Sequence, residues 1–531
     1  LYTIVDDSHF KLVSMEPEDL NGYYLCEEQG RTLAVFAGSE KLRYSMPFKL
    51  PQESIEYLKT RMDKSDTDMA VAFADDGEKF GLWPETHKWV YEQGWLEGFL
   101  EAIQKNKHWL KTITYGEYLE NHPPRGRIYL TCASYREMME WSGGYFRNFF
   151  IKYEEANNML SKMRYVSRKI SQLKVKHSDS KTKALINKAR RHLYKGQDND
   201  AYWHGVFGGL YLNHLRSAVY THLIEADKII DKISPKEENG IQEIDFNLDG
   251  AKEIIVTNSY HELYFSPSVS GALFEWDYKP KSVNLTNTIM RRYERYHERL
   301  KTKYSLKQNS SGSSVESIHN LYEVKEKGLD KLLYYDSSPR YSLIEHFIEE
   351  DSKLQDFVSS GLKEKNNTLD RKCRPSIIKD GFKKKLRLSR RVSIDNVELE
   401  LNKILQIEED ILIDYELKNS STHNISAIFG TEFNLSIYDP TLSKKAGTSE
   451  SQELVINDSW YGIKFNFHFD KKTNIWYFPL ETISESEAGI ERTYQELCLF
   501  LHWEINLKPE SIFKVKIDIE VDNKSRQEGN L

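Results

Sequence analysis

The stretch VAFADDGEKFGLWP, residues 71–84, ends a short apolar run with Asp75, Asp76 and Glu78 grouped around Gly77. Carboxylates this close repel one another, and a charge at the edge of a core is costly unless it is paired. One interpretation is a simple turn, because Asp-Gly is a common turn dipeptide where a strand ends. The other is a functional site that needs clustered carboxyl groups. The segments before and after this stretch favour the second interpretation.

Strands and helices alternate through the first part of the chain. Apolar runs typical of strands lie at 2–7, 32–38, 69–76 and 127–131. Helical spacing of apolar residues occurs at 54–62 and 86–104. Such alternation predicts a parallel sheet with helices outside, as an α/β barrel or an open sheet. Two strands end in acid, at Asp6-Asp7 and Asp75-Asp76, on the edge where these folds bind ligands.

The pattern changes further along the chain. Residues 145–235 are predicted to be mostly helical, and 198–226 begins in an acidic loop and becomes an aromatic-rich helix. From about 244 the period is two. Strict alternation at 397–404, 462–469 and 513–521 predicts half-buried antiparallel strands of a sandwich. The Ser/Gly-rich stretch 307–317 is predicted to be a surface loop.

Composition limits the classes of function. A chain of 531 residues is too long for one core, so two or three domains are expected. The net charge of -7 and the lack of a basic domain argue against nucleic acid as a partner. Four scattered cysteines predict a reducing, cytoplasmic compartment without a zinc site, and no apolar run is long enough for a membrane span. Aromatic residues make up 12%, which fits either core packing or platforms for sugars.

Two blocks of sequence resemble a known family. FADDGEKFGLWP (73–84) resembles the fourth conserved region of glycoside hydrolase family 57, in its 4-α-glucanotransferase and α-amylase branch. NDAYWHGVFGGLYLNHLR (199–216) resembles the fifth region of that branch. Segments similar to the connecting segments of these enzymes are IVDDSHF (4–10), EKLRYSMPF (40–48) and ASYREMMEW (133–141).

The resemblance implies a multidomain α/β plus β fold. It places the C-terminal part of a (β/α)7 barrel at 1–144 and a helical middle region that completes the cleft at 145–243. A jelly-roll-like β-sandwich follows at 244–531. The implied chemistry is a retaining reaction on α-1,4-glucans, with two carboxyl groups about 5–5.5 Å apart.

The family pattern also implies roles for individual residues. Asp76 matches the general acid/base, and neighbouring anions at an apolar strand end raise a carboxyl pKa as a general acid requires. Glu78 and Lys79 match positions that contact sugar hydroxyls or tune the acid, with a Glu78–Lys79 ion pair as the plainer interpretation. Asp7 and His9 end a strand at the same cleft, and we expect no direct role for them.

Four further residues are expected to bind substrate. Trp83 and Trp203 match aromatic residues that stack on sugar rings, although core packing is the usual fate of tryptophan. Asp200 and His204 match a loop that lines the cleft. The alternatives are that Asp200 caps the following helix and that His204 is structural.

The nucleophile of the family is not found in this chain. It is a Glu in a Trp-x-x-Glu segment upstream of the stretch that resembles IVDDSHF, and the sequence starts after that point. We therefore expect the chain to be a fragment of a longer product. By itself it should be inactive in double displacement and should fold poorly, because a half-barrel exposes sheet edges.

The sequence thus predicts a 4-α-glucanotransferase acting on maltooligosaccharides, amylose or starch. The alternatives are an α-amylase, with water as the acceptor, and a non-catalytic glucan-binding protein. An α-glucan is the expected partner, and a homodimer stays open. No organic cofactor is expected and no metal ligand is assigned, although the resemblance allows a structural calcium ion in the sandwich.

Overall fold

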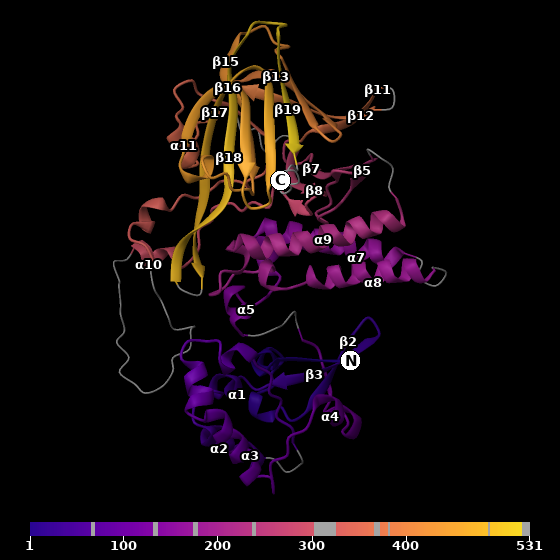
Figure 1. The fold of residues 1–531 in the computed structure, drawn as a ribbon, viewed down its shortest axis with the longest axis vertical. Helices are drawn as coiled ribbons and strands as arrows, with labels where there is room; N and C mark the ends of the chain where they lie inside the picture. The colour runs from indigo at the N-terminus through magenta and orange to yellow at the C-terminus, as the bar shows by residue number, and fades with distance from the viewer. Residues whose placement is uncertain are drawn as a thin grey trace, which may run out of the picture. The chain divides into compact units, whose positions relative to one another are not determined.

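The computed structural model describes residues 1–64, 69–130, 136–173, 179–235, 240–301, 325–365, 372–380, 383–486 and 489–522. Leu1–Phe149 form one compact unit, and nearly all described residues after Phe149 form a second (Figure 1). The predicted loop at 307–317 lies outside the described residues. Among the helices that the structure describes, none is both long and apolar enough to cross a membrane.

A four-stranded sheet lies at the centre of the first unit. Its strands are β1 (Tyr2–Asp6), β2 (Tyr23–Glu28), β3 (Arg31–Gly38) and β4 (Arg127–Ile128), in the order β1-β3-β2-β4. The predicted strands at 2–7 and 32–38 are confirmed, and they run parallel. The sheet is mixed, however, because β2 and β3 form an antiparallel hairpin that the alternation did not predict. Gln29 and Gly30 both have positive φ there, which suits a tight hairpin turn.

Three predicted elements are shorter than expected. In 69–76 only Ala72 pairs with the sheet, through a parallel bridge to Gly38, and in 127–131 the strand is limited to β4. The helix predicted at 86–104 is divided into a π-helical turn, Lys88–Glu92, and α3, Trp95–Lys105. Gly94 between them has φ +75, a left-handed conformation that interrupts a helix.

Short helices surround this sheet. They are α1 (Glu40–Ser45), α2 (Pro51–Met62), α3, α4 (Tyr115–Asn121) and α5 (Arg136–Trp141). Trp95 of α3 is buried with Leu42 and Met46 at the α1 end, and Phe36 of β3 packs with Tyr118 of α4. These contacts fix α1 directly after β3, at the carboxyl edge of the sheet.

The second unit begins with helices, after α6 (Asn148–Lys152). They are α7 (Glu154–Gln172), α8 (Ser180–Lys195) and α9 (Asn213–Ile233), and they lie side by side in Figure 1. Two 3-10 turns, Asp200–Tyr202 and Gly209–Tyr211, precede α9. The predictions of a helical region and of a loop that leads into a helix are therefore confirmed.

Lysine 162 ties α7 to the strands of the second unit. Its ammonium group lies 2.9 Å from Glu275 and 2.5 Å from Asp277, and all three side chains are fully buried or nearly so. A buried charge of this kind is tolerated only when it is paired.

Two antiparallel sheets form the rest of the second unit. The smaller has the order β5-β6-β7-β8-β9: Gly240–Ile244, Glu253–Thr257, His261–Ser266, Ala272–Tyr278 and Val283–Asn284. The larger consists of β10 (Ile344–Ile348), β11 (Arg374–Asp380), β12 (Lys383–Ile394), β13 (Val397–Ile407), β14 (Ile411–Lys418), β15 (Ile425–Leu435), β16 (Gly447–Asp458), β17 (Ile463–Ser486), β18 (Gly489–Leu507) and β19 (Ile512–Asp522). Short helices α10 (His297–Lys301) and α11 (Leu354–Val358) lie between β9 and β11 in the chain.

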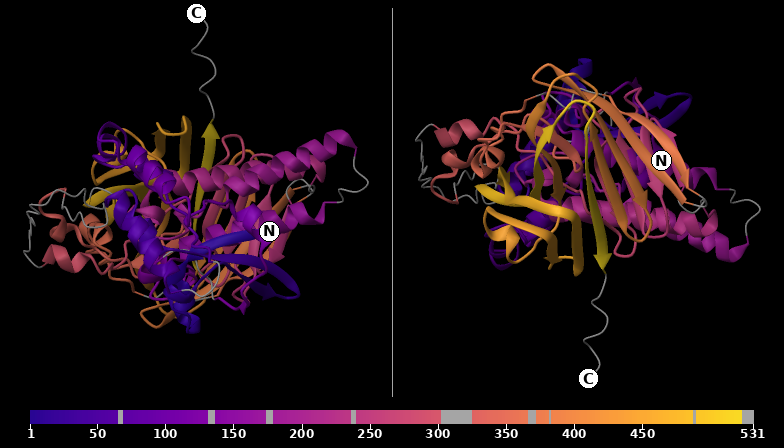
Figure 2. Two further views of the ribbon diagram at one scale, coloured as in Figure 1. Left: turned by 90° about the horizontal axis from the view of Figure 1, so that it is seen from below. Right: turned by 90° about the horizontal axis from the view of Figure 1, so that it is seen from above.

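The two sheets share one hydrophobic core, as in a β-sandwich. Trp276 of β8 packs edge-on against Phe465 of β17, with ring centroids 6.2 Å apart. The alternating stretches at 397–404, 462–469 and 513–521 are confirmed as parts of β13, β17 and β19. Figure 2 shows that neighbouring strands of the larger sheet are rotated relative to one another, which is the usual twist of a β-sheet.

Candidate active site

The turn that carries Asp75 and Asp76 begins where the backbone leaves the sheet. Ser39 N–H donates to Ala72 O at 2.8 Å, which holds residue 72 at the carboxyl end of β3. The chain then passes through Asp75 and Asp76 into a 3-10 turn, Gly77–Phe80. Asp76 N–H donates to Asp75 Oδ1 at 2.9 Å. The first aspartate therefore caps the peptide that carries the second.

Asp75 and Asp76 have opposite environments. The Asp75 side chain is 2% exposed and forms an ion pair of 2.5 Å with Lys79, whose side chain is 3% exposed. Burial raises the pKa of Asp75 to about 6, although the hydrogen bond and charge of Lys79 act against this rise. Asp76 and Glu78 are both exposed. The apolar setting that the sequence predicted for Asp76 therefore belongs to Asp75, whose side chain is held inside by its ion pair with buried Lys79.

Lys79 lies beneath a small aromatic surface. Its ammonium group donates to Arg43 O at 3.1 Å and lies 5.5 Å from the ring centroid of Trp83. Trp83 is half-buried and stacks on Phe48, with ring centroids 5.8 Å apart. The Glu78–Lys79 ion pair considered above is not formed, since Lys79 pairs with Asp75 instead. Lys79 therefore holds the turn in place through its bonds to Asp75 and to the Arg43 carbonyl, and Trp83 lies next to it.

A second group of charges lies at the carboxyl ends of β1 and β3. Asp6 forms an ion pair of 3.0 Å with Arg43, and Arg43 lies 3.3 Å from Glu137. The Tyr44 hydroxyl donates a short hydrogen bond to Glu137 as well. Burial raises the pKa of Asp6 and brings that of Asp7 to about 6. This edge of the sheet therefore holds several carboxyl groups in a poorly solvated setting.

Sequence reasoning missed part of this group. Arg43, Tyr44 and Glu137 lie in the stretches 40–48 and 133–141, which were interpreted only as connecting segments. No signal within these segments singles out Arg43 or Glu137, because both segments hold further charged residues such as Lys41 and Arg136. His9 is fully buried beside this edge, and Asp7 accepts a hydrogen bond from Glu40 N–H at 3.3 Å.

The remaining predicted residues belong to the second unit. Asp200 is exposed at the start of a 3-10 turn, and burial, with Asp198 nearby, raises its pKa. Trp203 is 5% exposed, and its carbonyl accepts the Leu210 N–H at 2.8 Å. Their roles in substrate binding remain predictions.

His204 is fully buried. Its Nδ1 lies 2.8 Å from Gly208 O and its Nε2 lies 3.0 Å from the Tyr296 hydroxyl. Burial lowers the pKa of His204 to about 4, so the imidazole is neutral near pH 7. In this arrangement the ring holds the 3-10 turn in place, and any contact with substrate remains a prediction.

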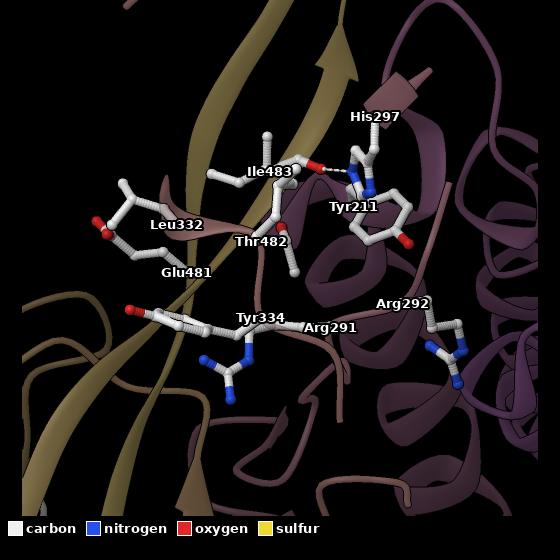
Figure 3. A pocket seen from close by; sticks show the side chains of 10 residues that line it. Tyr211, Arg291, Arg292, His297, Leu332, Tyr334, Glu481, Thr482 and Ile483 are labelled. Atoms are coloured by element: carbon white, nitrogen blue, oxygen red, sulfur yellow. Dashed lines mark hydrogen bonds between the residues drawn. The ribbon is translucent and has the colours of Figure 1, made fainter. Parts of the chain in front are cut away.

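A small pocket lies beside this turn in the second unit. Its lining residues, most of which Figure 3 labels, are Tyr211, Arg291, Arg292, His297, Leu332, Leu333, Tyr334, Glu481, Thr482 and Ile483. Arg291 pairs with Asp336 at 2.7 Å and Arg292 with Glu155 at 2.6 Å, so both guanidinium groups have structural partners. His297 is bonded to Ile483 O at 2.8 Å. These pairings are typical of a structural network and not of a reactive centre.

The described residues thus define a multidomain α/β plus β protein with a carboxylate-rich site at the edge of its first sheet. The comparisons agree with this class. Family models match residues 1–131 (Glycosyl hydrolase family 57), 144–230 (Alpha-amylase/4-alpha-glucanotransferase, middle domain) and 245–517 (Alpha-amylase/4-alpha-glucanotransferase, C-terminal). The chain belongs to glycoside hydrolase family 57, as the sequence blocks predicted.

Similar proteins cover nearly the whole chain. Alpha-amylase 1 of Dictyoglomus thermophilum is 37% identical, across 97% of this chain and 79% of its own length. The 4-alpha-glucanotransferase of Thermococcus kodakarensis is 34% identical, across 92% of this chain and 74% of its own length. The solved structure of 4-alpha-glucanotransferase from Thermococcus litoralis matches with a TM-score of 0.79 and 30% identity, covering 98% of this chain and 78% of that one. The predicted class, a glycoside-active enzyme of the glucanotransferase and amylase branch, is confirmed.

Proposed function

We propose that this protein cleaves α-1,4-glucans with retention and passes the glycosyl unit to the 4-hydroxyl of another glucan. Asp76 is the general acid/base. The observation that carries the assignment is the division between the two aspartates: Asp75 is buried and paired with Lys79, whereas Asp76 is exposed on the peptide that Asp75 caps. Of the two, only Asp76 can reach the oxygen of a bound sugar without breaking a buried ion pair.

The chemistry then follows from the carboxyl group. Protonated Asp76 gives its proton to the leaving glycosidic oxygen, and a second carboxylate holds the glycosyl unit covalently. The Asp76 carboxylate next removes the proton from the acceptor hydroxyl, which attacks the glycosyl-enzyme. We assign the second carboxylate to no residue of this chain. The reaction as written needs no cofactor.

The neighbouring side chains have supporting roles. Exposed Glu78 accepts hydrogen bonds from sugar hydroxyls, and Trp83 offers ring surface to a sugar face. Lys79 is a positioning residue, because its ammonium group is already bonded to Asp75 and to the Arg43 carbonyl. Asp200 is an exposed acid of the second block and binds substrate directly, while His204 and Trp203 hold its turn.

The first unit is part of a (β/α)7 barrel in this proposal. The parallel pairing of Gly38 with Ala72 supports it, since α1 and α2 lie between them and parallel neighbours with helices between them are the repeating element of such barrels. The acidic groups at the ends of these strands lie at the edge where barrels carry their active sites.

Hydrolysis is the second candidate function. The similar proteins are named both as 4-alpha-glucanotransferases and as alpha-amylases, and the Dictyoglomus thermophilum protein at 37% identity has the amylase name. The two activities share the cleavage step and differ in whether a sugar or water accepts the glycosyl unit.

The role of Asp76 is tested by chemical rescue in the complete gene product. We expect Asp76→Ala to lower turnover of maltooligosaccharides by about 10²–10⁴-fold, the usual contribution of a general acid. For a maltoside with a good leaving group, formation of the glycosyl-enzyme should be slowed little, because departure needs no proton, and its breakdown then limits turnover. Azide attacks without general-base help, so it should restore turnover and yield a glycosyl azide of retained configuration.

Asp75→Ala is the matched control. It removes the adjacent carboxyl group and should not be rescued by azide, because its defect lies in the fold of the turn. The assignment is wrong if Asp76→Ala keeps wild-type turnover on maltooligosaccharides, or if azide rescues Asp75→Ala instead.

A further inference from the structure

Two histidines that the glucan chemistry does not use meet between helices α8 and α9. His192 lies in the last turn of α8, and His222 lies near the middle of α9. Their Nδ1 atoms are 3.2 Å apart, and their ring centroids are 5.2 Å apart with the planes tilted by 57°. Both residues are half-buried, so small solutes can reach the pair from solvent.

The two Nδ1 atoms are placed as two ligands of one metal ion would be. Neutral imidazole binds zinc at about 2.0–2.1 Å, and tetrahedral geometry then separates two such nitrogens by about 3.3–3.4 Å. The observed separation is 3.2 Å. An N–H···N hydrogen bond also fits this distance, but it needs a proton on one of the two nitrogens. Moving that proton to Nε2 of the same ring leaves both Nδ1 atoms able to bind a metal.

The electrostatic setting keeps both rings in the form that binds metal. Burial is the largest cause that lowers the pKa of His192 and of His222, and the charge of Lys195 lowers both further. The two imidazoles are therefore neutral near pH 7, as metal ligands must be. Glu225 acts on both pKa values in the opposite direction. Its carboxylate therefore favours a cation held between the rings.

The surroundings of the pair are held in place by other contacts. Glu225 Oε1 accepts hydrogen bonds from Lys228 Nζ at 2.8 Å and from the Ser282 hydroxyl. Helices α8 and α9 pack against each other, and Leu193 of α8 and Leu223 of α9, each next in sequence to one of the histidines, are buried. Ligands carried by two packed helices keep their separation, which is what a binding site for a metal ion requires.

We propose that His192 and His222 bind one zinc ion through their Nδ1 atoms, with water completing the coordination and Glu225 as the neighbouring counter-charge. Imidazole nitrogen suits zinc, whereas Ca²⁺ and Mg²⁺ take oxygen ligands. No three His, Cys, Asp or Glu side chains of the described residues surround one metal position, so the protein supplies two ligands. The site uses no cysteine, and it therefore differs from the kind of zinc site that the scattered cysteines argued against.

The ion would join two points of the chain that are far apart in sequence. His192 and His222 are 30 residues apart, and the segment between them includes the turn that carries Asp200. A link of this kind restricts the unfolded chain, and an ion that binds only the folded state stabilises it. Zinc should therefore stabilise the packing of α8 on α9 and hold both ends of this segment together.

The test is zinc binding by the intact protein after treatment with a chelator. Titration calorimetry should give one bound Zn²⁺ per chain, and Zn²⁺ should raise the midpoint of thermal unfolding whereas equal Mg²⁺ should not. Co²⁺ gives a second readout, since it replaces zinc and its visible absorption reports nitrogen ligands. None of these readouts depends on enzyme activity.

Variants locate the ion. His192→Gln and His222→Gln should each weaken Zn²⁺ binding at least ~10-fold, because even the loss of an outer partner of a ligand costs about 10–100-fold. Each should also abolish the rise in the unfolding midpoint. His214→Gln, at an exposed histidine of α9, is the matched control and should bind Zn²⁺ as the wild type does.

Two results would overturn the proposal. One is a wild type that shows no stoichiometric Zn²⁺ binding, which would leave the pair as a hydrogen bond between helices. The other is unchanged Zn²⁺ affinity in both His192→Gln and His222→Gln, each folded by circular dichroism, which would place the bound ion elsewhere.

Discussion

At the scale of single residues, the site works by giving adjacent carboxyl groups different surroundings. Asp75 is buried against Lys79, and Asp76 is turned to solvent by the peptide that Asp75 caps. A turn with only one carboxyl group would have to hold the backbone and react with substrate through the same side chain. With two carboxyl groups, Asp75 holds the backbone and Asp76 reacts with the substrate. This division of roles explains why the sequence places adjacent acids where their mutual repulsion is unfavourable.

Removal of Lys79 should therefore destabilise the fold more than removal of an ordinary lysine. We expect Lys79→Met to lower the free energy of unfolding by about 3–5 kcal/mol near pH 8, because it leaves the Asp75 charge buried without a partner. Chemical denaturation followed by tryptophan fluorescence measures the loss. Lys88→Met, at an exposed lysine close by in the chain, is the control and should change stability little.

The loss should also depend on pH. Burial raises the pKa of Asp75 to about 6 in spite of Lys79, and we expect removal of Lys79 to raise it further. The unfolded chain releases this proton near pH 4, so both proteins lose stability as pH rises from about 4 to 6. Above pH 6 only Lys79→Met continues to lose stability, so its deficit at pH 5 should be smaller than its deficit at pH 8. An equal deficit at both values would contradict this account.

At the scale of elements, a partly buried histidine joins two strands of the larger sheet. His346 of β10 has its Nε2 2.9 Å from Glu432 of β15 and its Nδ1 in a short contact with Glu364. Burial alone would lower the pKa of His346, but these two carboxylates raise it to about 10. The imidazolium is therefore part of the strand pairing near pH 7.

The sign of its pH dependence follows from linkage. A histidine whose folded pKa exceeds its unfolded value contributes stability that is fully present below about pH 6.5 and lost toward pH 10. We expect the wild type to lose thermal stability across this range more steeply than His346→Gln. Scanning calorimetry at pH 6, 8 and 10 measures the difference, and His468→Gln, a half-exposed histidine of β17, should follow the wild type. Parallel slopes for wild type and His346→Gln would show that His346 is not charged at pH 7.

The sequence could predict those elements whose own pattern of apolar and polar residues determines their secondary structure. The alternating stretches at 397–404 and 513–521 were correct because one face of each strand is buried in the shared core. The run at 69–76 was less reliable, because its backbone pairs with the sheet only at Ala72 and then turns. The hairpin formed by β2 and β3 was missed, because β2 ends in Glu27 and Glu28, which interrupt the apolar pattern by which a strand is identified.

The candidate site shows the same limit. Sequence located the turn at 75–79, but the choice of which aspartate is buried depends on Arg43 and Lys79, which meet only in the folded chain. Likewise, the partners of His204 are Gly208 and Tyr296, and the second of these is 92 residues away in sequence.

At the scale of the whole molecule, three successive family models account for most of the chain, from 1 to 517. The sandwich carries the larger core, whereas Asp76, the carboxyl group assigned to proton transfer, lies in the first unit. Product identity should depend on the residues around Asp76.

The last prediction concerns those products. A glucanotransferase breaks one α-1,4 bond for each one it forms, so maltotetraose should give both shorter and longer oligosaccharides while the number of reducing ends stays constant. An α-amylase would raise the number of reducing ends with every cleavage. Chromatography of the products together with a reducing-end assay, on the complete gene product, separates the two, and we expect transfer to dominate.

Trp83→Ala should shift the balance toward hydrolysis, because a sugar acceptor loses a stacking surface worth about 1 kcal/mol whereas water does not. Trp460→Ala, which removes an exposed tryptophan of the second unit, should leave the ratio unchanged. A steady rise in reducing ends for the wild type, unaffected by Trp83→Ala, would establish hydrolysis as the activity.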